Sequence, residues 1–117
     1  MTGPTDLRGV SAATLRRRRA ALLRRLPPLK TILRGSLIER YKRCGKPGCR
    51  CAKGPGHGPK LYLSVSQSGA RPVMEYVPTA YQEQVRAFLE NHRQARAVLD
   101  EICEINLELL RRREELE

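Results

Sequence analysis

Three cysteines and one histidine lie close together in the chain, at Cys44, Cys49, Cys51 and His57. Three thiolates and one imidazole make a complete tetrahedral ligand set for a structural zinc ion. Glycines and prolines separate these residues, so the backbone can wrap tightly around one ion. The spacing C-x4-C-x-C-x5-H differs from the common C-x2-C pair, which leaves open a glycine-rich basic loop with reduced thiols or a reactive thiol. We expect these four residues to hold one Zn²⁺.

Basic residues are concentrated in the first half of the chain. The net charge is +11, and residues 1–60 carry 16 basic and two acidic residues, for +14, whereas residues 61–117 carry −3. An excess of this size on one half is typical of a protein that binds a polyanion. A solvated basic face or an acidic protein partner would also account for it. The candidate nucleic-acid contacts are Arg16, Arg17, Arg18, Arg19, Arg24, Arg25, Arg40, Lys42, Arg43, Lys46, Arg50, Lys53 and Arg71.

The sequence argues against several other classes of protein. No apolar run approaches the ~18–20 residues of a transmembrane helix, and the first residues lack the apolar core of a secretory signal. No nucleotide-binding glycine motif, nucleophile–base arrangement or acidic pair in a pocket-like context is present. We therefore expect a cytoplasmic protein that is not an enzyme, does not associate with a membrane and takes no small-molecule substrate.

Hydrophobic periodicity predicts helices at both ends of the chain and strands between them. Ser11 is a predicted N-cap for a helix that reaches Leu26, before Pro27-Pro28. Residues 36–43 alternate like a strand, and residues 61–66 and 73–77 alternate as a hairpin around Gly69. Residues 44–60 are too rich in glycine and proline for regular structure.

The predicted fold is α+β. A small zinc-stapled, three-stranded antiparallel meander is flanked by an N-terminal helix and a long C-terminal helix. Residues 1–10 form a flexible lead-in and residues 11–117 a single domain. Within that domain we expect a basic helical arm over 11–34, the zinc loop and meander over 35–78, and the long helix over 79–117.

The long helix carries an apolar stripe that is broader than a coiled-coil seam. It includes Val85, Phe88, Leu99, Ile102 and Leu109. The helix over 11–26 offers fewer large apolar residues, so we expect the long helix to pack on it and also on a second copy or a helical partner protein. Cys103 and His92 lie in this pattern and are interpreted as packing residues.

Part of the sequence resembles a family of small, functionally uncharacterised prokaryotic proteins. The resemblance is carried by the run from Gly35 to Cys51 and by the segments His57-Gly58-Pro59, Tyr62-Leu63-Ser64 and Tyr76-Val77-Pro78. Members of the family share a C-G-K-x-x-C-x-C…H-G-P signature, a hairpin and a long C-terminal helix. The resemblance covers about residues 30–110 and leaves the arginine-rich start outside it. It implies a prokaryotic, intracellular setting and an association with mobile elements, and it carries no activity.

Three strands followed by a helix, with basic residues on the sheet, are similar in architecture to the arm-type DNA-binding domains of tyrosine recombinases. This is an analogy of fold and not evidence of function. The sequence predicts a zinc-containing accessory protein that binds nucleic acid, DNA in preference to RNA. The alternative is an interaction or assembly subunit that docks through its long helix.

Overall fold

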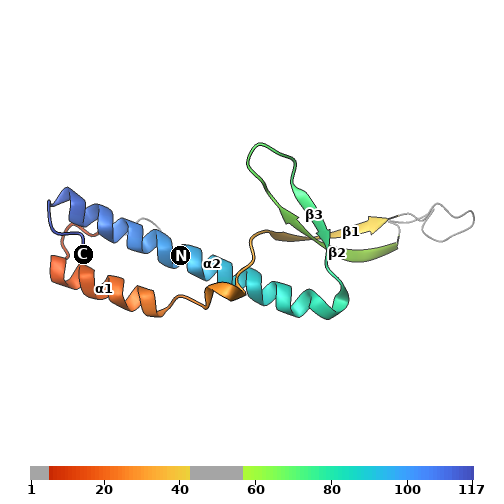
Figure 1. The fold of residues 1–117 in the computed structure, drawn as a ribbon, viewed down its shortest axis with the longest axis horizontal. Coiled ribbons are helices and arrows are strands. Elements are labelled where there is room, and N and C mark those ends of the chain that lie inside the picture. Colours follow the sequence, from red (N-terminus) through yellow and green to blue (C-terminus); the bar gives the residue numbers. More distant parts are fainter. Residues whose placement is uncertain (1–5, 43–56) are drawn as a thin grey trace, which may run out of the picture. The chain divides into compact units, whose positions relative to one another are not determined.

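The computed structural model describes residues 6–42 and 57–117 (Figure 1). The strands form one antiparallel sheet in the order β1-β2-β3, which confirms the predicted α+β meander between two helices. The elements in chain order are α1 Ala12–Arg24, η1 Leu29–Thr31, β1 Ser36–Lys42, β2 His57–Val65, β3 Val73–Tyr76, η3 Thr79–Tyr81 and α2 Gln82–Arg111.

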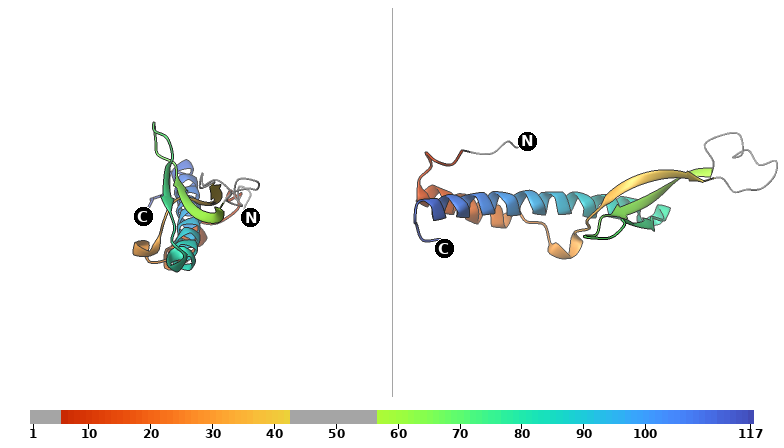
Figure 2. Two further views of the ribbon diagram at one scale, coloured as in Figure 1. Left: turned by 90° about the vertical axis from the view of Figure 1, so that its right-hand side faces the viewer. Right: turned by 90° about the horizontal axis from the view of Figure 1, so that it is seen from above.

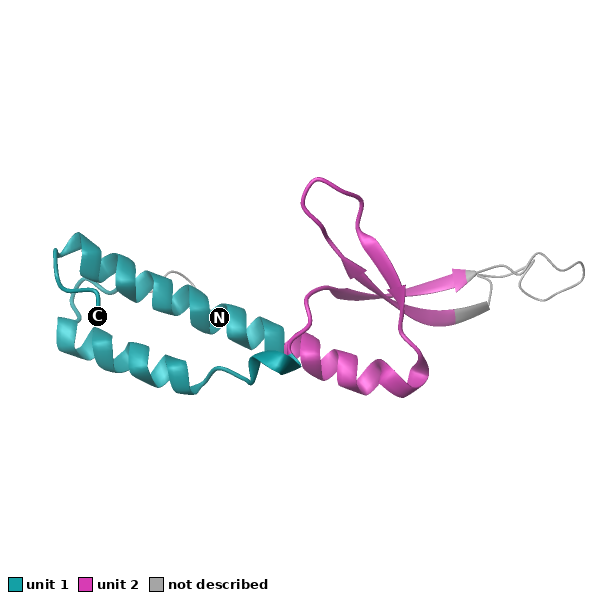
Figure 3. Ribbon diagram, viewed as in Figure 1, with its two compact units in different colours: residues 1–31, 91–117 teal, residues 32–90 magenta. Residues whose placement is uncertain are grey.

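The described part of the chain forms two compact units (Figure 3). Unit 1 consists of residues 1–31 and 91–117, and unit 2 of residues 32–90. Each unit has an apolar cluster of its own. Hydrophobic periodicity could not show this division, because the long helix α2 contributes residues to both units without a break in its pattern.

Unit 1 is a pair of antiparallel helices, α1 and the C-terminal part of α2 (Figure 1, Figure 2). The Ser11 hydroxyl accepts a hydrogen bond of 3.1 Å from the Thr14 N–H, which confirms the predicted N-cap. The predicted packing of the two helices is also confirmed. Leu15 and Leu22 of α1 are buried in one cluster with three residues of α2, Val98, Ile105 and Leu109.

The end of α2 is set by a hydrogen-bonded turn, six residues before the end of the long helix predicted over 79–117. The Glu114 N–H donates to the Leu109 carbonyl, and the Arg113 N–H donates to the Leu110 carbonyl. Arg113 adopts a left-handed conformation, with φ of 58°. These are the two hydrogen bonds of a Schellman motif, which ends a helix by satisfying its last carbonyls.

Unit 2 packs one face of the sheet on the first turns of α2. Leu61, Leu63 and Val65 alternate along β2, and they share a cluster with Val85 and Leu89 of α2. Gly35, just before β1, has φ of +141°, and a Cβ at this position would lie 2.8 Å from both Leu63 Cδ1 and the Ser64 carbonyl oxygen. Only glycine fits this approach of the two strands.

Two further predictions need correction. β2 begins at His57, so residues 57–60, which were expected in the irregular loop, belong to the strand because they pair with the end of β1. Cys103 is exposed and does not pack. The buried face of α2 in unit 1 is centred on Val98, Ile105 and Leu109, which turns Cys103 and the 53%-exposed Leu99 toward solvent.

None of the described helices is long and apolar enough to cross a membrane.

Candidate nucleic-acid interface

The sheet of unit 2 has a second face, here called the outer face, that points away from the α2 cluster. Because side chains alternate along a strand, the residues between Leu61, Leu63 and Val65 point to this opposite side. The register then assigns the neighbours on β1 and β3. The outer face consists of Ser36, Ile38 and Arg40 from β1, Lys60, Tyr62 and Ser64 from β2, and Met74 and Tyr76 from β3.

Two positive charges lie directly opposite each other on the outer face. Arg40 of β1 is the antiparallel partner of Lys60 of β2, and both residues are exposed. Like charges at directly opposed positions destabilise a sheet. A negatively charged ligand bound between them would remove this repulsion.

Two tyrosines lie beside this basic pair. Tyr62 is the antiparallel partner of Tyr76, with ring centroids 5.7 Å apart and ring planes at 62°, an edge-to-face contact. The Arg40 guanidinium carbon lies 5.9 Å from the Tyr62 ring centroid, and the Lys60 Nζ lies 5.9 Å from the Tyr76 ring centroid. Each cation is therefore held over a ring by a cation–π interaction.

The acidic residues of the strands are on the other side of the sheet. Glu39 pairs with Leu61 and Glu75 pairs with Leu63, both on the face that carries the α2 cluster. These are the only acids in the three described strands. The charge on the outer face is therefore uniformly positive along the strands.

The six arginines predicted on the N-terminal helix fall into two groups in unit 1. Arg17, Arg18, Arg24 and Arg25 are exposed, whereas Arg16 and Arg19 are partly buried. Arg16 Nη2 donates to the Glu115 carbonyl at 2.7 Å, and Arg19 Nη1 donates to the Asn106 side chain at 2.6 Å and to the Leu116 carbonyl. Arg16 and Arg19 thus hold the C-terminal segment on α1, which leaves the first group as the more accessible cations.

The remaining predicted contacts are placed as follows. Arg71 is exposed in the turn between β2 and β3. For Lys42 and His57 the structure describes the strand positions only, where the two residues are paired with each other. The other predicted loop residues lie outside the described residues: Arg43, Cys44, Lys46, Cys49, Arg50, Cys51 and Lys53.

Lys60 was absent from the sequence-based set of contacts, and so were Tyr62 and Tyr76, which the sequence offers either as base-stacking candidates or as packing residues. Lys60 was assigned to the irregular loop because Gly58 and Pro59 precede it. The alternation of polar and apolar residues along the strand could have identified Lys60 as a contact, because Lys60 lies two residues before Tyr62 on the polar side.

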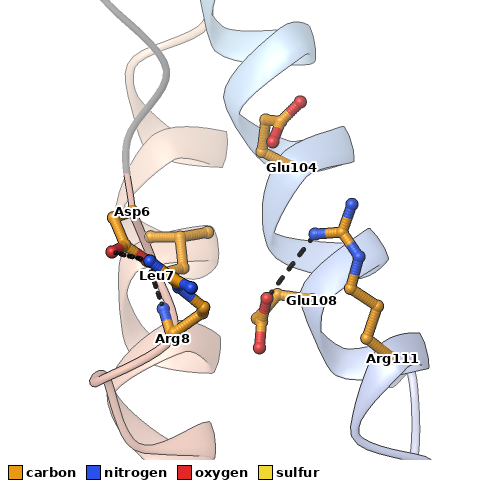
Figure 4. A pocket seen from close by; sticks show the side chains of 6 residues that line it. All are labelled: Asp6, Leu7, Arg8, Glu104, Glu108 and Arg111. Atoms are coloured by element: carbon orange, nitrogen blue, oxygen red, sulfur yellow. Dashed lines mark hydrogen bonds and ion pairs between the residues drawn. The ribbon is translucent and has the colours of Figure 1, made fainter.

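Polar groups also converge at an open pocket in unit 1 (Figure 4). It is lined by Asp6, Leu7, Arg8, Glu104, Glu108 and Arg111. The pKa of Asp6 is lowered to about 2 by hydrogen bonds from Arg8. Glu108 is 7% exposed, and one of its carboxylate oxygens accepts a hydrogen bond of 2.8 Å from Arg112 Nε. Asp6 and Glu108 therefore both have arginine partners.

Within residues 6–42 and 57–117, no group of three or more His, Cys, Asp or Glu side chains could hold a metal ion. The predicted zinc ligands other than His57 lie outside these residues. The register does bring the two ends of the loop together, because Lys42, two residues before Cys44, pairs with His57.

Residues 12–87 match a family model described as a domain of unknown function (DUF6788). The chain belongs to this family. No curated protein and no solved structure gave a significant match. Membership confirms that the sequence resembles an uncharacterised family, although the matched region differs from the expected one. It starts at residue 12 and so includes the arginines of α1, which were expected to lie outside the shared pattern.

The family match also includes every strand of the sheet and ends within the first turns of α2. Both groups of exposed cations described above, on α1 and on the outer face, are therefore inside the region that defines the family. The exposed leucines Leu99, Leu107 and Leu110 of α2 lie beyond it.

Proposed function

We propose that the protein is a non-enzymatic accessory protein that binds nucleic acid, DNA in preference to RNA. The outer face of the sheet is one contact surface, and the exposed arginines Arg17, Arg18, Arg24 and Arg25 of unit 1 are a second. Unit 2 carries ten basic and four acidic residues, for a net charge of +6, so the field around the sheet favours the approach of a polyanion.

The observation that carries this proposal is the pairing of Arg40 with Lys60. A fold that needed these positions only for stability would place an acid or a neutral residue opposite Arg40. Local arrangements that cost stability without a structural gain are typical of functional sites. Nucleic acids carry regularly spaced negative charges on their phosphodiester backbone. Such a backbone can bind a pair of exposed cations on a sheet.

The preference for DNA rests on the shape of the surface. The major groove of B-DNA is wide enough to admit a β-ribbon, so a sheet can approach the phosphates on either side of it. The major groove of A-form RNA is deep and narrow and does not admit such an element. An exposed sheet face with cations from two adjacent strands suits the wider groove.

We also propose that Cys44, Cys49, Cys51 and His57 hold one structural zinc ion. The support from the fold is that His57 begins β2 opposite Lys42 at the end of β1. The chain therefore leaves and re-enters the sheet at neighbouring positions, which is the arrangement that a metal-stapled loop requires. The same segment of the sequence also carries Lys46, Arg50 and Lys53, which add to the positive charge of this unit.

Binding can be tested by fluorescence anisotropy with a labelled 20-base-pair DNA duplex over a series of salt concentrations. If about six phosphates are neutralised, log K falls against log salt with a slope of about −5. Arg40→Gln and Lys60→Gln should each make the slope less steep by about 0.9, because each removes one phosphate contact. An RNA duplex of the same sequence should bind more weakly.

Arg86→Gln provides a matched control. Arg86 is an exposed arginine of unit 2, and it lies on α2 instead of the sheet. Its replacement removes the same charge from the same unit, so it should change the affinity less than Arg40→Gln does. Equal effects of the two substitutions would show that only net charge matters, and an absence of binding at ~50 mM salt would exclude the proposed function.

The second candidate function is docking to another protein chain through α2 in unit 1. Leu99, Cys103, Leu107 and Leu110 are exposed at spacings of three and four residues, so they share one side of the helix. Leu99 and Leu110 remain 53% and 47% exposed. A second copy of the chain is the expected partner, because a two-fold dimer is the commonest way to cover such a face.

Light scattering distinguishes this second candidate from the first. The unaltered chain should be a dimer, and Leu99→Gln with Leu110→Gln should yield a monomer that still binds the DNA duplex. A monomer at every concentration of the unaltered protein would exclude self-association.

A further inference from the structure

We infer that the outer face recognises the sugar–phosphate backbone and not the bases, with Tyr62 and Tyr76 as positioning residues for Arg40 and Lys60. This inference rests on the proposed function and specifies its ligand chemistry. Exposed tyrosines beside cations on a sheet are also what a protein would use to stack on the bases of a single strand. The contacts between these four side chains favour the first reading.

The tyrosine rings are already occupied by neighbouring groups. Arg40 lies over the Tyr62 ring and Lys60 over the Tyr76 ring, each at 5.9 Å from the centroid. The two rings also contact each other edge to face. A stacked base needs the same electron-rich ring surface that attracts the cation, so base stacking would have to compete with both cation–π contacts.

The same contacts restrict the two cations. Lysine and arginine side chains normally lose much rotamer freedom when they bind a ligand, at a cost in affinity. A ring beneath each side chain limits that freedom before a ligand arrives. Arg40 and Lys60 are thereby held beside each other on adjacent strands, with their N–H groups available to phosphate oxygens.

Backbone recognition also predicts which form of DNA binds best. A duplex carries one phosphate per ≈1.7 Å of its axis, a higher charge density than a single strand has, and it releases more counterions for each phosphate contact. The outer face should therefore prefer a duplex to a single strand, and it should bind different sequences with similar affinity.

The test compares three ligands of equal length: a DNA duplex, a thymidine single strand and a single strand of abasic deoxyribose phosphates. Each affinity is measured for the unaltered full chain and for a double variant that carries both Arg40→Gln and Lys60→Gln. The difference in affinity then reports on the outer face and not on the arginines of α1. We expect this double variant to lose the same factor in affinity on the thymidine strand as on the abasic strand. A greater loss on the thymidine strand would overturn the inference.

The tyrosines are tested by replacement with Leu, which removes the ring, and with Phe, which keeps it. Tyr76 is 46% exposed on the edge strand, so Tyr76→Leu should still fold. This variant can therefore be measured even if Tyr62→Leu impairs folding. Loss of positioning should weaken binding about 2- to 5-fold on both strands, with Phe restoring it. Loss of a stacking platform would instead weaken thymidine binding by about 5- to 150-fold and leave abasic binding unchanged.

Tyrosine emission gives an independent readout, because the chain contains no tryptophan. Backbone recognition predicts that the thymidine and abasic strands change this emission equally. Quenching by the thymidine strand alone, abolished in Tyr76→Leu, would overturn the inference while leaving nucleic-acid binding in place. If none of the three ligands binds, the proposed function itself is wrong.

Discussion

Arg40 of β1 lies directly opposite Lys60 of β2, on the face of the sheet that points away from α2. This pairing has a consequence for stability that is separate from binding. Lys60 also contacts the Tyr76 ring, so the effect of the repulsion is measured in Tyr76→Leu protein, where this cation–π contact is already absent. In that background, Lys60→Gln should raise the free energy of unfolding by about 0.2–1 kcal/mol, because it removes repulsion between directly opposed like charges. Urea denaturation at low salt measures the change.

Lys30→Gln is the matched control, since Lys30 is an exposed lysine of unit 1 with no place in the sheet. It should leave the stability nearly unchanged. Salt at ~1 M should remove most of the gain from Lys60→Gln, because it screens the repulsion. If both variants had the same effect, the cross-strand pair would not be the source of the gain.

Gly35 is required by the close approach of β1 and β2. Gly35→Ala should destabilise the protein by about 1–3 kcal/mol, because φ of +141° is unfavourable for alanine and the new Cβ would lie 2.8 Å from the Ser64 carbonyl oxygen. Thermal denaturation followed by circular dichroism measures this. Gly9→Ala is the control, since no other atom lies within 4 Å of a Cβ at that position. Equal stabilities of the two variants would contradict the prediction.

The chain before α1 is held on unit 1 by Arg112. Its Nη2 donates to the Leu7 carbonyl at 2.7 Å and to the Arg8 carbonyl at 3.2 Å, while its Nε donates to Glu108. Arg112→Met should release this segment and leave the buried Glu108 without its closest partner, at a cost of about 1–3 kcal/mol. Hydrogen exchange should show faster exchange at the Val10 N–H, which donates to the Leu7 carbonyl.

Arg111→Met is the control for this prediction. Arg111 also faces Glu108, but at 3.6 Å and with a side chain that is 63% exposed, so it should contribute little. Unchanged exchange at Val10 in Arg112→Met would mean that burial of Leu7 alone holds the segment.

Zinc should be present in protein purified without added metal. We expect about one equivalent by elemental analysis, as for a closed site of three thiolates and one imidazole. Chelation should loosen the sheet, since metal binding that organises a loop contributes to folding free energy. Cys44→Ser should lower the zinc content, whereas Cys103→Ser should not, because Cys103 lies on α2. Less than about 0.2 equivalents in the unaltered protein would exclude the site.

The local structure of this protein could be predicted from the sequence to a large extent. Ser11 caps α1, Pro27-Pro28 follows its end, and the alternation of Leu61, Leu63 and Val65 defines the buried side of β2. These features depend on interactions within a few residues of the chain, such as a capping hydroxyl, a missing N–H or the two-residue period of a strand. Such short-range interactions can be recognised in the sequence without knowledge of the fold.

The candidate site depended on contacts that are distant in the sequence. Strand register places Arg40 opposite Lys60, and Tyr62 opposite Tyr76. A shift of one residue in this register would move each side chain of a strand to the opposite face of the sheet. The division of α2 between two units likewise depends on which segments pack against each half of the helix. The sequence by itself determined the type and order of the main helices and strands and the excess of positive charge. Only the tertiary structure decided which charges meet, because register and packing join residues that no local pattern relates.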